Sequence, residues 1–358
     1  MSRKPTKLFS ALILSLIMTL CCNPVFACSW AFFKLPLPKA PGEKTGWTTA
    51  AIVARTMDWG YMDEAVIKGV KAGAVLRTAE DELDNPLTYT AKYASIQIFS
   101  FGKNMVSDAL NEMGLQGSLL YLEGSKLPDY REGAHGVDPF LFIAYAVSVF
   151  DSVDEVVQCV REGRLNFLHV ANAMKEGSQP SAHLPFHFAF SDVTGGRAII
   201  EFIDGKAKIY NDLEDSALTN EPVYSVHKAL EKSDYQPNGS ISTIDRRARA
   251  KRYLKEMYAS GLVTDTPGAL MAMRGLVASV FAGLEEIDRS ETETESEKMR
   301  DFVYPTQWWT LTDLQSGTYY LTRLDSWCAE VYTFAMVANM PENQGVLVPA
   351  ARSHPKIP

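Results

Sequence analysis

The first 27 residues have the three-part layout of a cleavable export signal. Residues 1–7 carry three basic side chains and no acidic one, residues 8–22 form a dense apolar run, and a polar break at 23–24 leads to Ala27. The apolar run is shorter than the roughly 20 residues that span a bilayer, so a membrane anchor is the less favoured alternative. We therefore predict a signal peptide of residues 1–27 and a single mature domain of residues 28–358, periplasmic or secreted.

This cleavage would make Cys28 the first residue of the mature chain. Its new α-amino group would have a pKa of roughly 7.7–8.0 and could take a proton from the thiol of the same residue. Because a thiolate is the stronger nucleophile, one residue would supply both nucleophile and base for acyl transfer. The alternative is a lipoprotein signal, in which Cys28 is acylated on sulfur and amine. The chain would then be a lipid-tethered, non-catalytic binding protein of the envelope.

Composition argues against several classes of function. The signal holds three of the 35 basic residues and none of the 43 acidic ones, so the mature chain is acidic and disfavours nucleic-acid binding. No segment after residue 27 is apolar over enough residues to suggest membrane attachment. Cys28, Cys159 and Cys328 remain, an odd number that leaves at least one free thiol. Without any Cys-x-x-Cys pair we predict no metal and no cofactor, and a small-molecule substrate as partner.

The order of predicted elements favours an α+β layered domain over a doubly wound parallel sheet. Alternating apolar residues between turn signals predict strands, and apolar periodicity predicts helices. Ser152, with Glu155 three residues later, has the pattern of a capping box at a helix start. An acidic stretch at 287–301 predicts a solvated loop. The predicted strands are 48–54, 95–101, 115–122, 186–190, 197–202, 206–210, 309–314 and 317–324, and the predicted helices are 137–150, 243–258 and 267–281.

Two charged residues directly after the predicted strand at 48–54 are candidates for activating Cys28. Arg55 and Asp58 stand three residues apart. A guanidinium near the sulfur would lower the thiol pKa, and a carboxylate could hold the α-amine. An ordinary ion pair at the end of a strand explains the same spacing equally well.

Cys28, followed by Ala-Arg-Thr-Met-Asp-Trp at 54–59, resembles the choloylglycine hydrolase family, which includes penicillin V acylases and conjugated bile-salt hydrolases. Several later segments resemble motifs of this family in the same order. Together they span essentially the whole mature chain. These segments lie at 110–115, 150–156, 186–201, 218–222, 245–249, 304–308 and 319–320.

The resemblance implies a four-layer αββα sandwich of the N-terminal-nucleophile hydrolase type, usually assembled as a homo-tetramer. It also implies residue roles. Cys28 would attack the amide carbonyl, and its own amine would relay the proton to the leaving nitrogen. Arg55 and Arg246 would orient the thiolate, Asp58 would hold the amine, and Asn220 would stabilise the oxyanion.

Tyr121 is the expected second oxyanion donor. An ungapped count from Gly114 places it where penicillin V acylases of the family have Tyr and bile-salt hydrolases have Asn. Arg247 departs from the family pattern, in which Phe is usual at this position. We interpret Asn111 and His187 as structural residues.

The predicted function is therefore that of a cysteine amidase acting on an N-acyl amide, similar to penicillin V acylase, with N-acyl homoserine lactones as a further substrate class. Conjugated bile-salt hydrolysis is the alternative within the family. Four aromatic residues, Trp30, Trp59, Tyr61 and Tyr121, favour an aromatic or fatty acyl group. Trp30 and Trp59 fit a place in the core equally well.

Overall fold

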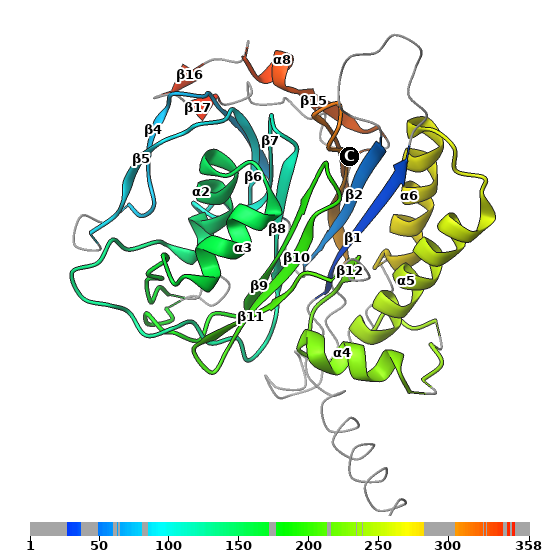
Figure 1. Ribbon diagram of the computed structural model, residues 1–358, viewed down its shortest axis with the longest axis horizontal. Helices are drawn as coiled ribbons and strands as arrows, with labels where there is room; N and C mark the ends of the chain where they lie inside the picture. Colours follow the sequence, from blue (N-terminus) through cyan, green and yellow to red (C-terminus); the bar gives the residue numbers. More distant parts are fainter. Residues whose placement is uncertain are drawn as a thin grey trace, which may run out of the picture.

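Two antiparallel sheets form the centre of the molecule (Figure 1). The signal peptide up to residue 26, Tyr61 and the acidic stretch at 287–301 lie outside the residues that the structure describes, so the expectations for them stay predictions. The computed structural model describes residues 27–36, 49–59, 63, 65–80, 85–171, 177–212, 216–233, 235–237, 239–282, 305–324, 326, 328–338, 342–343 and 346–347.

The six-stranded sheet is built around a long pair of strands, β1 and β2, at the start of the described residues. These two strands pair over ten residues, from Ala27 opposite Asp58 to Pro36 opposite Thr49. The sheet runs in the order β12, β1, β2, β13, β14, β15. Its strands are β1 (Ala27–Pro36), β2 (Thr49–Asp58), β12 (Ala217–Leu218), β13 (Thr306–Asp313), β14 (Thr318–Arg323) and β15 (Glu330–Thr333).

The nine-stranded sheet contains the two strands predicted at 186–190 and 197–202, which pair as a hairpin. It runs in the order β11, β10, β9, β8, β7, β6, β3, β17, β16, and a separate ribbon pairs β4 with β5. The strands are β3 (Val66–Val70), β4 (Val75–Arg77), β5 (Thr88–Thr90), β6 (Ser95–Phe99), β7 (Val106–Asn111), β8 (Leu115–Tyr121), β9 (Phe186–Asp192), β10 (Arg197–Ile203), β11 (Lys206–Tyr210), β16 (Glu342–Asn343) and β17 (Val346–Leu347).

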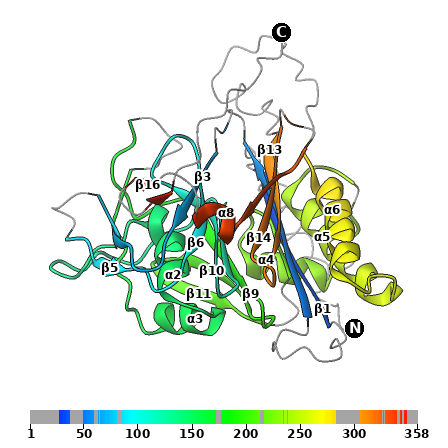
Figure 2. The same cartoon turned by 90° about the horizontal axis from the view of Figure 1, so that it is seen from above.

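Both faces of the six-stranded sheet are covered. Successive side chains of a strand point to opposite faces, so neighbours in β1 enter different cores. Trp30 packs between the two sheets, whereas Ala31 packs beneath the helices α5 (Thr243–Ser260) and α6 (Thr266–Val280). Figure 2 shows these two helices along the outer side of β1 and β13.

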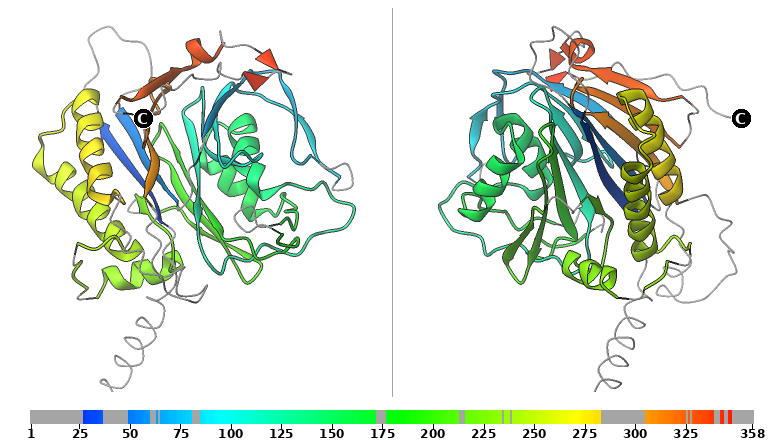
Figure 3. Two further views of the ribbon diagram at one scale, coloured as in Figure 1. Left: turned by 180° about the vertical axis from the view of Figure 1, so that it is seen from behind. Right: turned by 45° about the vertical axis from the view of Figure 1, so that its right-hand side comes forward.

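A second helical layer covers the other sheet. The helices α2 (Phe142–Val149) and α3 (Val153–Arg161) pack on the outer face of the nine-stranded sheet (Figure 3). Three apolar cores thus separate four layers, and the predicted α+β sandwich is confirmed. In the described residues, every helix falls short of the length and apolarity that crossing a membrane needs. The remaining helices are η2 (Pro139–Leu141), α4 (Tyr224–Glu231) and α8 (Phe334–Ala338).

The capping box predicted at the start of α3 is wrong. Ser152 occupies the N-cap position, but its side chain makes no capping hydrogen bond. The peptide N–H of Val153 instead donates to Asp192 Oδ2 at 2.9 Å. The cap therefore comes from the β9–β10 hairpin, about 40 residues away in sequence, because packing of α3 on the sheet brings that carboxylate to the helix start.

Candidate active site

Cys28 lies near the start of β1, opposite Met57 of β2. Its side chain belongs to the core between the two sheets and is 3% exposed. The peptide N–H of Cys28 donates to Asn220 Oδ1 at 2.6 Å, and the carbonyl of Cys28 accepts from Arg246 Nη1 at 2.8 Å. The structure thus brings three of the predicted site residues into direct contact.

The thiol of Cys28 is under opposing influences. Burial is the largest and raises its pKa; the charge of Arg55 lowers it, and the charge of Asp58 raises it. The peptide N–H of Asp58 and the charge of Arg246 also lower it. The net pKa lies above the ordinary value in this full-length chain, so formation of the thiolate depends on the two guanidinium groups.

Arg55 approaches Cys28 from the space between the sheets. Its side chain is fully buried and lies over the ring of Trp308, with 4.4 Å between the guanidinium carbon and the ring centroid. Arg55 Nη2 donates to the Leu119 carbonyl at 2.9 Å, and Nε lies 3.6 Å from Asp108 Oδ2. Among the described residues Nη1 has no hydrogen-bond partner, so one donor is available to an anion.

Sequence analysis missed Asp108, which holds Arg55. Asp108 lies in β7, on the same face as Leu110, and is fully buried. Gln116 Nε2 and Ser118 Oγ donate to its two oxygens at 3.1 and 2.7 Å, and the hydroxyl of Tyr319 donates as well. Burial raises the pKa of Asp108, while Arg55 and these donors lower it. An acid on the apolar face of an alternating strand is the sequence signal that would have found it.

Asp58 lies on the opposite, helical side of the sheet. Its carboxylate accepts from the hydroxyls of Thr306 at 2.6 Å and Thr56 at 3.2 Å, and Arg246 Nη1 lies 3.7 Å from Oδ2. Burial raises the pKa of Asp58 to about 7, although Arg246 and the two hydroxyls lower it. In this full-length chain the nitrogen of Cys28 belongs to the peptide bond with Ala27 and donates to Asn220 Oδ1 in place of the expected contact with Asp58.

Arg246 ties helix α5 to β1. It lies in the first turn of the helix, where Ser242 acts as N-cap and accepts from the N–H of Asp245. From this position Nη1 also donates to Ser29 Oγ at 2.7 Å, and Nη2 donates to Asn220 Oδ1 at 3.1 Å. Arg246 therefore fixes the backbone of Cys28 and the amide of Asn220 together.

Two buried histidines hold the segment that carries Asn220. His187 Nε2 lies 2.9 Å from the Thr219 carbonyl, and His227 Nε2 lies 3.1 Å from the Asn220 carbonyl. Burial lowers the pKa of His227 to about 3, so it is neutral and donates. Asn220 Nδ2 donates to the Tyr121 carbonyl at 2.9 Å. An amide nitrogen carries two protons, which leaves the second for an oxyanion.

Tyr121 is the last residue of β8 and contacts the site through its backbone and its ring. Besides accepting from Asn220, it places its ring centroid 6.2 Å from that of Trp59 and 6.4 Å from that of Phe186. Trp59 also packs edge-on against Phe101 at 5.5 Å. Trp59 and Tyr121 thus lie in one aromatic cluster. Trp30 is fully buried in the core between the sheets, a position that favours packing over substrate contact.

Glu221, next to the predicted oxyanion residue Asn220, is a partly buried acid to which the sequence assigned no role. Burial raises its pKa to about 7; the charge of Arg246 lowers it and that of Glu123 raises it. Among the described residues its Oε2 has no hydrogen-bond partner. An ionisable carboxyl group therefore stands beside the site, poorly compensated by its surroundings.

Arg247, which departs from the family pattern, and Asn111, which was expected to be structural, both bond within the fold. Arg247 is buried, where it ion-pairs with Glu231 and donates to the Tyr224 hydroxyl at 3.1 Å. Asn111 donates to two carbonyls and accepts from two peptide N–H groups, which satisfies its whole amide. Both side chains are thus fully committed to the fold, and Asn111 is structural as predicted.

Comparison with known proteins gives one family and a small set of relatives. The sequence profile of "Linear amide C-N hydrolases, choloylglycine hydrolase family" matches residues 46–243, more than half of the chain. A protein of Pectobacterium atrosepticum named penicillin V acylase is 28% identical over 286 residues, which cover 75% of this chain and 73% of that protein.

Two solved structures share the fold. Penicillin V acylase from Agrobacterium tumefaciens superposes with a TM-score of 0.66 at 19% identity, covering 86% of each chain. A mutant of conjugated bile acid hydrolase from Clostridium perfringens superposes with a TM-score of 0.65 at 18% identity, covering 90% of this chain and 97% of that one. The two superpose almost equally well, so the fold does not choose between their substrates.

Proposed function

Because this chain belongs to the choloylglycine hydrolase family of linear amide C–N hydrolases, we propose that it is a cysteine amidase of the N-terminal-nucleophile type and that Cys28 is its nucleophile. One observation carries the proposal. Arg55 and Asp58 of β2, Asn220 after β12 and Arg246 of α5 surround Cys28, although these residues together with Cys28 are spread over more than 200 residues of sequence. A binding protein that uses Cys28 only as a lipid anchor has no need of this arrangement.

The proposed reaction starts when cleavage after Ala27 frees the amine of Cys28. The thiol proton passes to this amine, and the thiolate attacks the acyl carbonyl to form a C–S bond. Asn220 Nδ2 and, as predicted, Tyr121 stabilise the oxyanion, where loss of one donor typically costs about 3–4 kcal/mol. The C–N bond then breaks, the leaving nitrogen takes the proton from the amine, and water hydrolyses the thioester.

The proposed substrate is an N-acyl amide with an aromatic or fatty acyl group, as in penicillin V or a long-chain N-acyl homoserine lactone. The aromatic cluster of Trp59, Phe101, Tyr121 and Phe186 supports this choice, and so do the two relatives named penicillin V acylase. Hydrolysis of conjugated bile salts is the second candidate, favoured by the similar superposition of the Clostridium perfringens protein.

Amine release from penicillin V, a long-chain acyl homoserine lactone and glycocholate tests the proposal. Cys28→Ser should abolish release while the protein stays folded, and Cys328→Ser, which changes an exposed thiol, should leave it unchanged. Activity retained in Cys28→Ser would exclude Cys28 as nucleophile. The substrate released fastest identifies the acyl and amine class.

Export, processing and assembly are part of the same proposal. We expect a periplasmic or secreted homo-tetramer whose chain begins at an unmodified Cys28. Intact mass spectrometry measures the processing site directly, and sedimentation of the purified protein measures the assembly. A diacylglycerol on Cys28 would support the lipid-tethered binding protein instead, because both reacting groups would be blocked.

A further inference from the structure

The segment that carries Asn220 has no regular backbone structure of its own. It leaves the six-stranded sheet after Leu218, at the end of β12, and enters α4 at Tyr224. Residues 219–223 belong to neither a helix nor a strand. No ladder or helical pattern of hydrogen bonds therefore fixes the amide of Asn220, and side chains from other elements have to hold this segment.

A buried histidine and a buried glutamate hold both ends of the segment. His187 of β9 and Glu201 of β10 come from two paired strands of the nine-stranded sheet, and both side chains are fully buried. His187 Nε2 lies 2.9 Å from the Thr219 carbonyl oxygen, and its Nδ1 lies 3.3 Å from Glu201 Oε1. The same carboxyl oxygen accepts from the peptide N–H of Tyr224 at 2.9 Å. The pair therefore binds the first residue of the segment and the first residue of α4.

These contacts fix the number of protons that the pair carries. A carbonyl oxygen only accepts, so Nε2 of His187 must carry a proton. The contact between Nδ1 and Glu201 Oε1 needs a second proton, on the ring or on the carboxyl group. The pair thus holds one proton more than a neutral imidazole and a carboxylate, and it is neutral overall. Among the described residues Glu201 Oε2 has no hydrogen-bond partner, so the buried carboxyl group depends on His187 and Tyr224.

Other elements hold the middle of the segment. Asn220 Nδ2 donates to the Tyr121 carbonyl of β8 at 2.9 Å, so three adjacent strands of the nine-stranded sheet contact the segment. From the side of α5, the hydroxyl of Thr219 donates to the Thr243 carbonyl at 2.9 Å, and the hydroxyl of Thr243 donates to the Glu221 carbonyl. The orientation of the Asn220 amide therefore depends on residues that need not touch a substrate.

We propose that His187 and Glu201 are positioning residues for the amidase reaction. They fix the backbone of residues 219–224 so that the second amide N–H of Asn220 is directed at the oxyanion. Among the described residues neither member of the pair bonds to Cys28. The inference rests on the proposed function, because it assigns the pair to the oxyanion step. It gives His187, which the sequence suggests is structural, a part in the reaction, since a shift of about 1 Å can cost about 100-fold in rate.

Glu201→Gln tests the proposal with little change in shape. The new amide oxygen can accept from Tyr224, but a neutral His187 has one proton for two acceptors and loses one of its two hydrogen bonds. We expect kcat to fall about 10- to 100-fold on whichever substrate the wild type hydrolyses, less than the loss of a whole oxyanion donor. KM should change by less than about threefold, because the oxyanion forms only in the transition state.

A double variant and a control separate positioning from a general loss of stability. In His187→Gln/Glu201→Gln one new amide can donate to the Thr219 carbonyl and the other can accept from Tyr224, so part of kcat should return. Asp192→Ala, at the other end of β9, disturbs a turn and a helix cap but not this segment. At a temperature where circular dichroism shows every variant folded, this control should keep kcat within about twofold of the wild type.

Hydrogen–deuterium exchange of the peptide that covers residues 219–226 provides a readout without turnover. It should be faster in Glu201→Gln than in the wild type or in Asp192→Ala. Unchanged kcat in folded Glu201→Gln would overturn the proposal, and so would a lower kcat without faster exchange. If the wild type releases no amine from any substrate, the amidase proposal fails, and unchanged exchange in Glu201→Gln would then show that the pair does not hold the segment either.

Discussion

Two buried pairs of charged residues lie next to Cys28. Arg55 and Arg246 reach Cys28 from opposite faces of one sheet, and each is held by an acid: Asp108 for Arg55 and Asp58 for Arg246. All four charged side chains are fully buried, where an uncompensated charge is expensive. Their pairing therefore positions the guanidinium groups within a core that would otherwise exclude them.

The raised pKa of Glu221 should make the stability of the protein depend on pH. Its pKa rises from 4.5 in the unfolded chain to about 7 in the folded one. Between these pH values the folded state keeps a proton that the unfolded state has released, so rising pH favours unfolding. The free energy of unfolding falls by up to about 3 kcal/mol through this group as the pH rises. In Glu221→Gln this fall in stability should not occur. The variant should therefore become more stable relative to the wild type as the pH rises from 5 to 8.

Urea unfolding of the full-length chain at both pH values measures the effect. The exposed Glu132→Gln serves as a matched control and should follow the wild type. If the free energy of unfolding of Glu221→Gln changes between pH 5 and pH 8 by the same amount as that of the wild type, the fold does not hold this carboxyl group in its neutral form.

At the element scale, one carboxylate joins a hairpin to a helix. Asp192 Oδ1 accepts from the N–H groups of Thr194 and Gly196 at 2.9 and 3.0 Å and from the Thr194 hydroxyl at 2.6 Å. Asp192 Oδ2 caps α3 through Val153. The hairpin turn and the helix start therefore depend on the same side chain.

Asp192→Ala should destabilise the protein by about 2–4 kcal/mol, because several buried or partly buried donors lose their acceptor. Ser152→Ala removes the residue that the sequence suggests as the cap and should cost less than about 0.5 kcal/mol, since its side chain makes no capping bond here. Chemical denaturation of both variants compares them directly. If Ser152→Ala lowers the free energy of unfolding more than Asp192→Ala does, Ser152 rather than Asp192 is the main cap of α3.

At the scale of the whole molecule, the proposed cleavage after Ala27 would change the nitrogen of Cys28. In the full-length chain this nitrogen is a peptide donor to Asn220, and Ala27 occupies the strand position opposite Asp58. A peptide nitrogen cannot accept the thiol proton, so the proposed mechanism has its general base only in a chain from which Ala27 has been removed.

The full-length chain should therefore release amine at least about 100-fold more slowly than a chain that begins at Cys28, the usual contribution of a general base. Both forms can be purified, checked by intact mass, and assayed on whichever substrate the wild type hydrolyses. Equal rates would mean that the α-amine takes no part in the reaction.

Local patterns in the sequence were enough to predict most of the layered fold. The strands predicted at 115–122, 186–190 and 197–202 correspond to β8, β9 and β10, and the helices predicted at 243–258 and 267–281 correspond to α5 and α6. These patterns reflect which face of each element is buried. Motif order also predicted Arg55, Asp58, Asn220 and Arg246 as site residues. Asn220 and Arg246 contact Cys28, Asp58 lies beside Arg246, and the charge of Arg55 acts on the thiol of Cys28.

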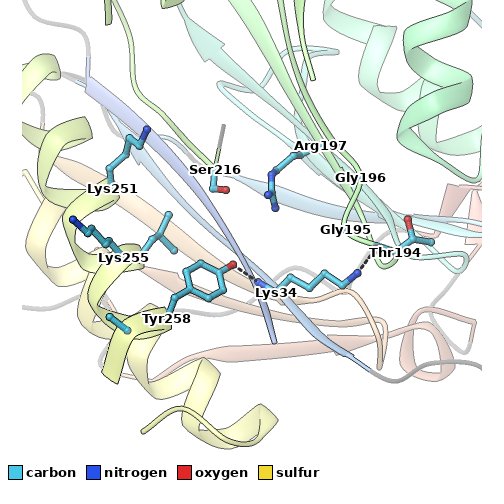
Figure 4. A pocket seen from close by; sticks show the side chains of 11 residues that line it. Lys34, Thr194, Gly195, Gly196, Arg197, Ser216, Lys251, Lys255 and Tyr258 are labelled. Atoms are coloured by element: carbon cyan, nitrogen blue, oxygen red, sulfur yellow. Dashed lines mark hydrogen bonds between the residues drawn. The ribbon is translucent and has the colours of Figure 1, made fainter. Parts of the chain in front are cut away.

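Only the tertiary structure revealed the partners of these residues. Asp108 holds Arg55, His187 holds the Thr219 carbonyl, and Asp192 caps α3, each across more than 30 residues. No local pattern encodes such contacts, because they depend on how whole sheets and helices pack. The same packing places Lys34, Arg197 and helix α5 around one pocket (Figure 4), which the separate sequence segments gave no reason to expect.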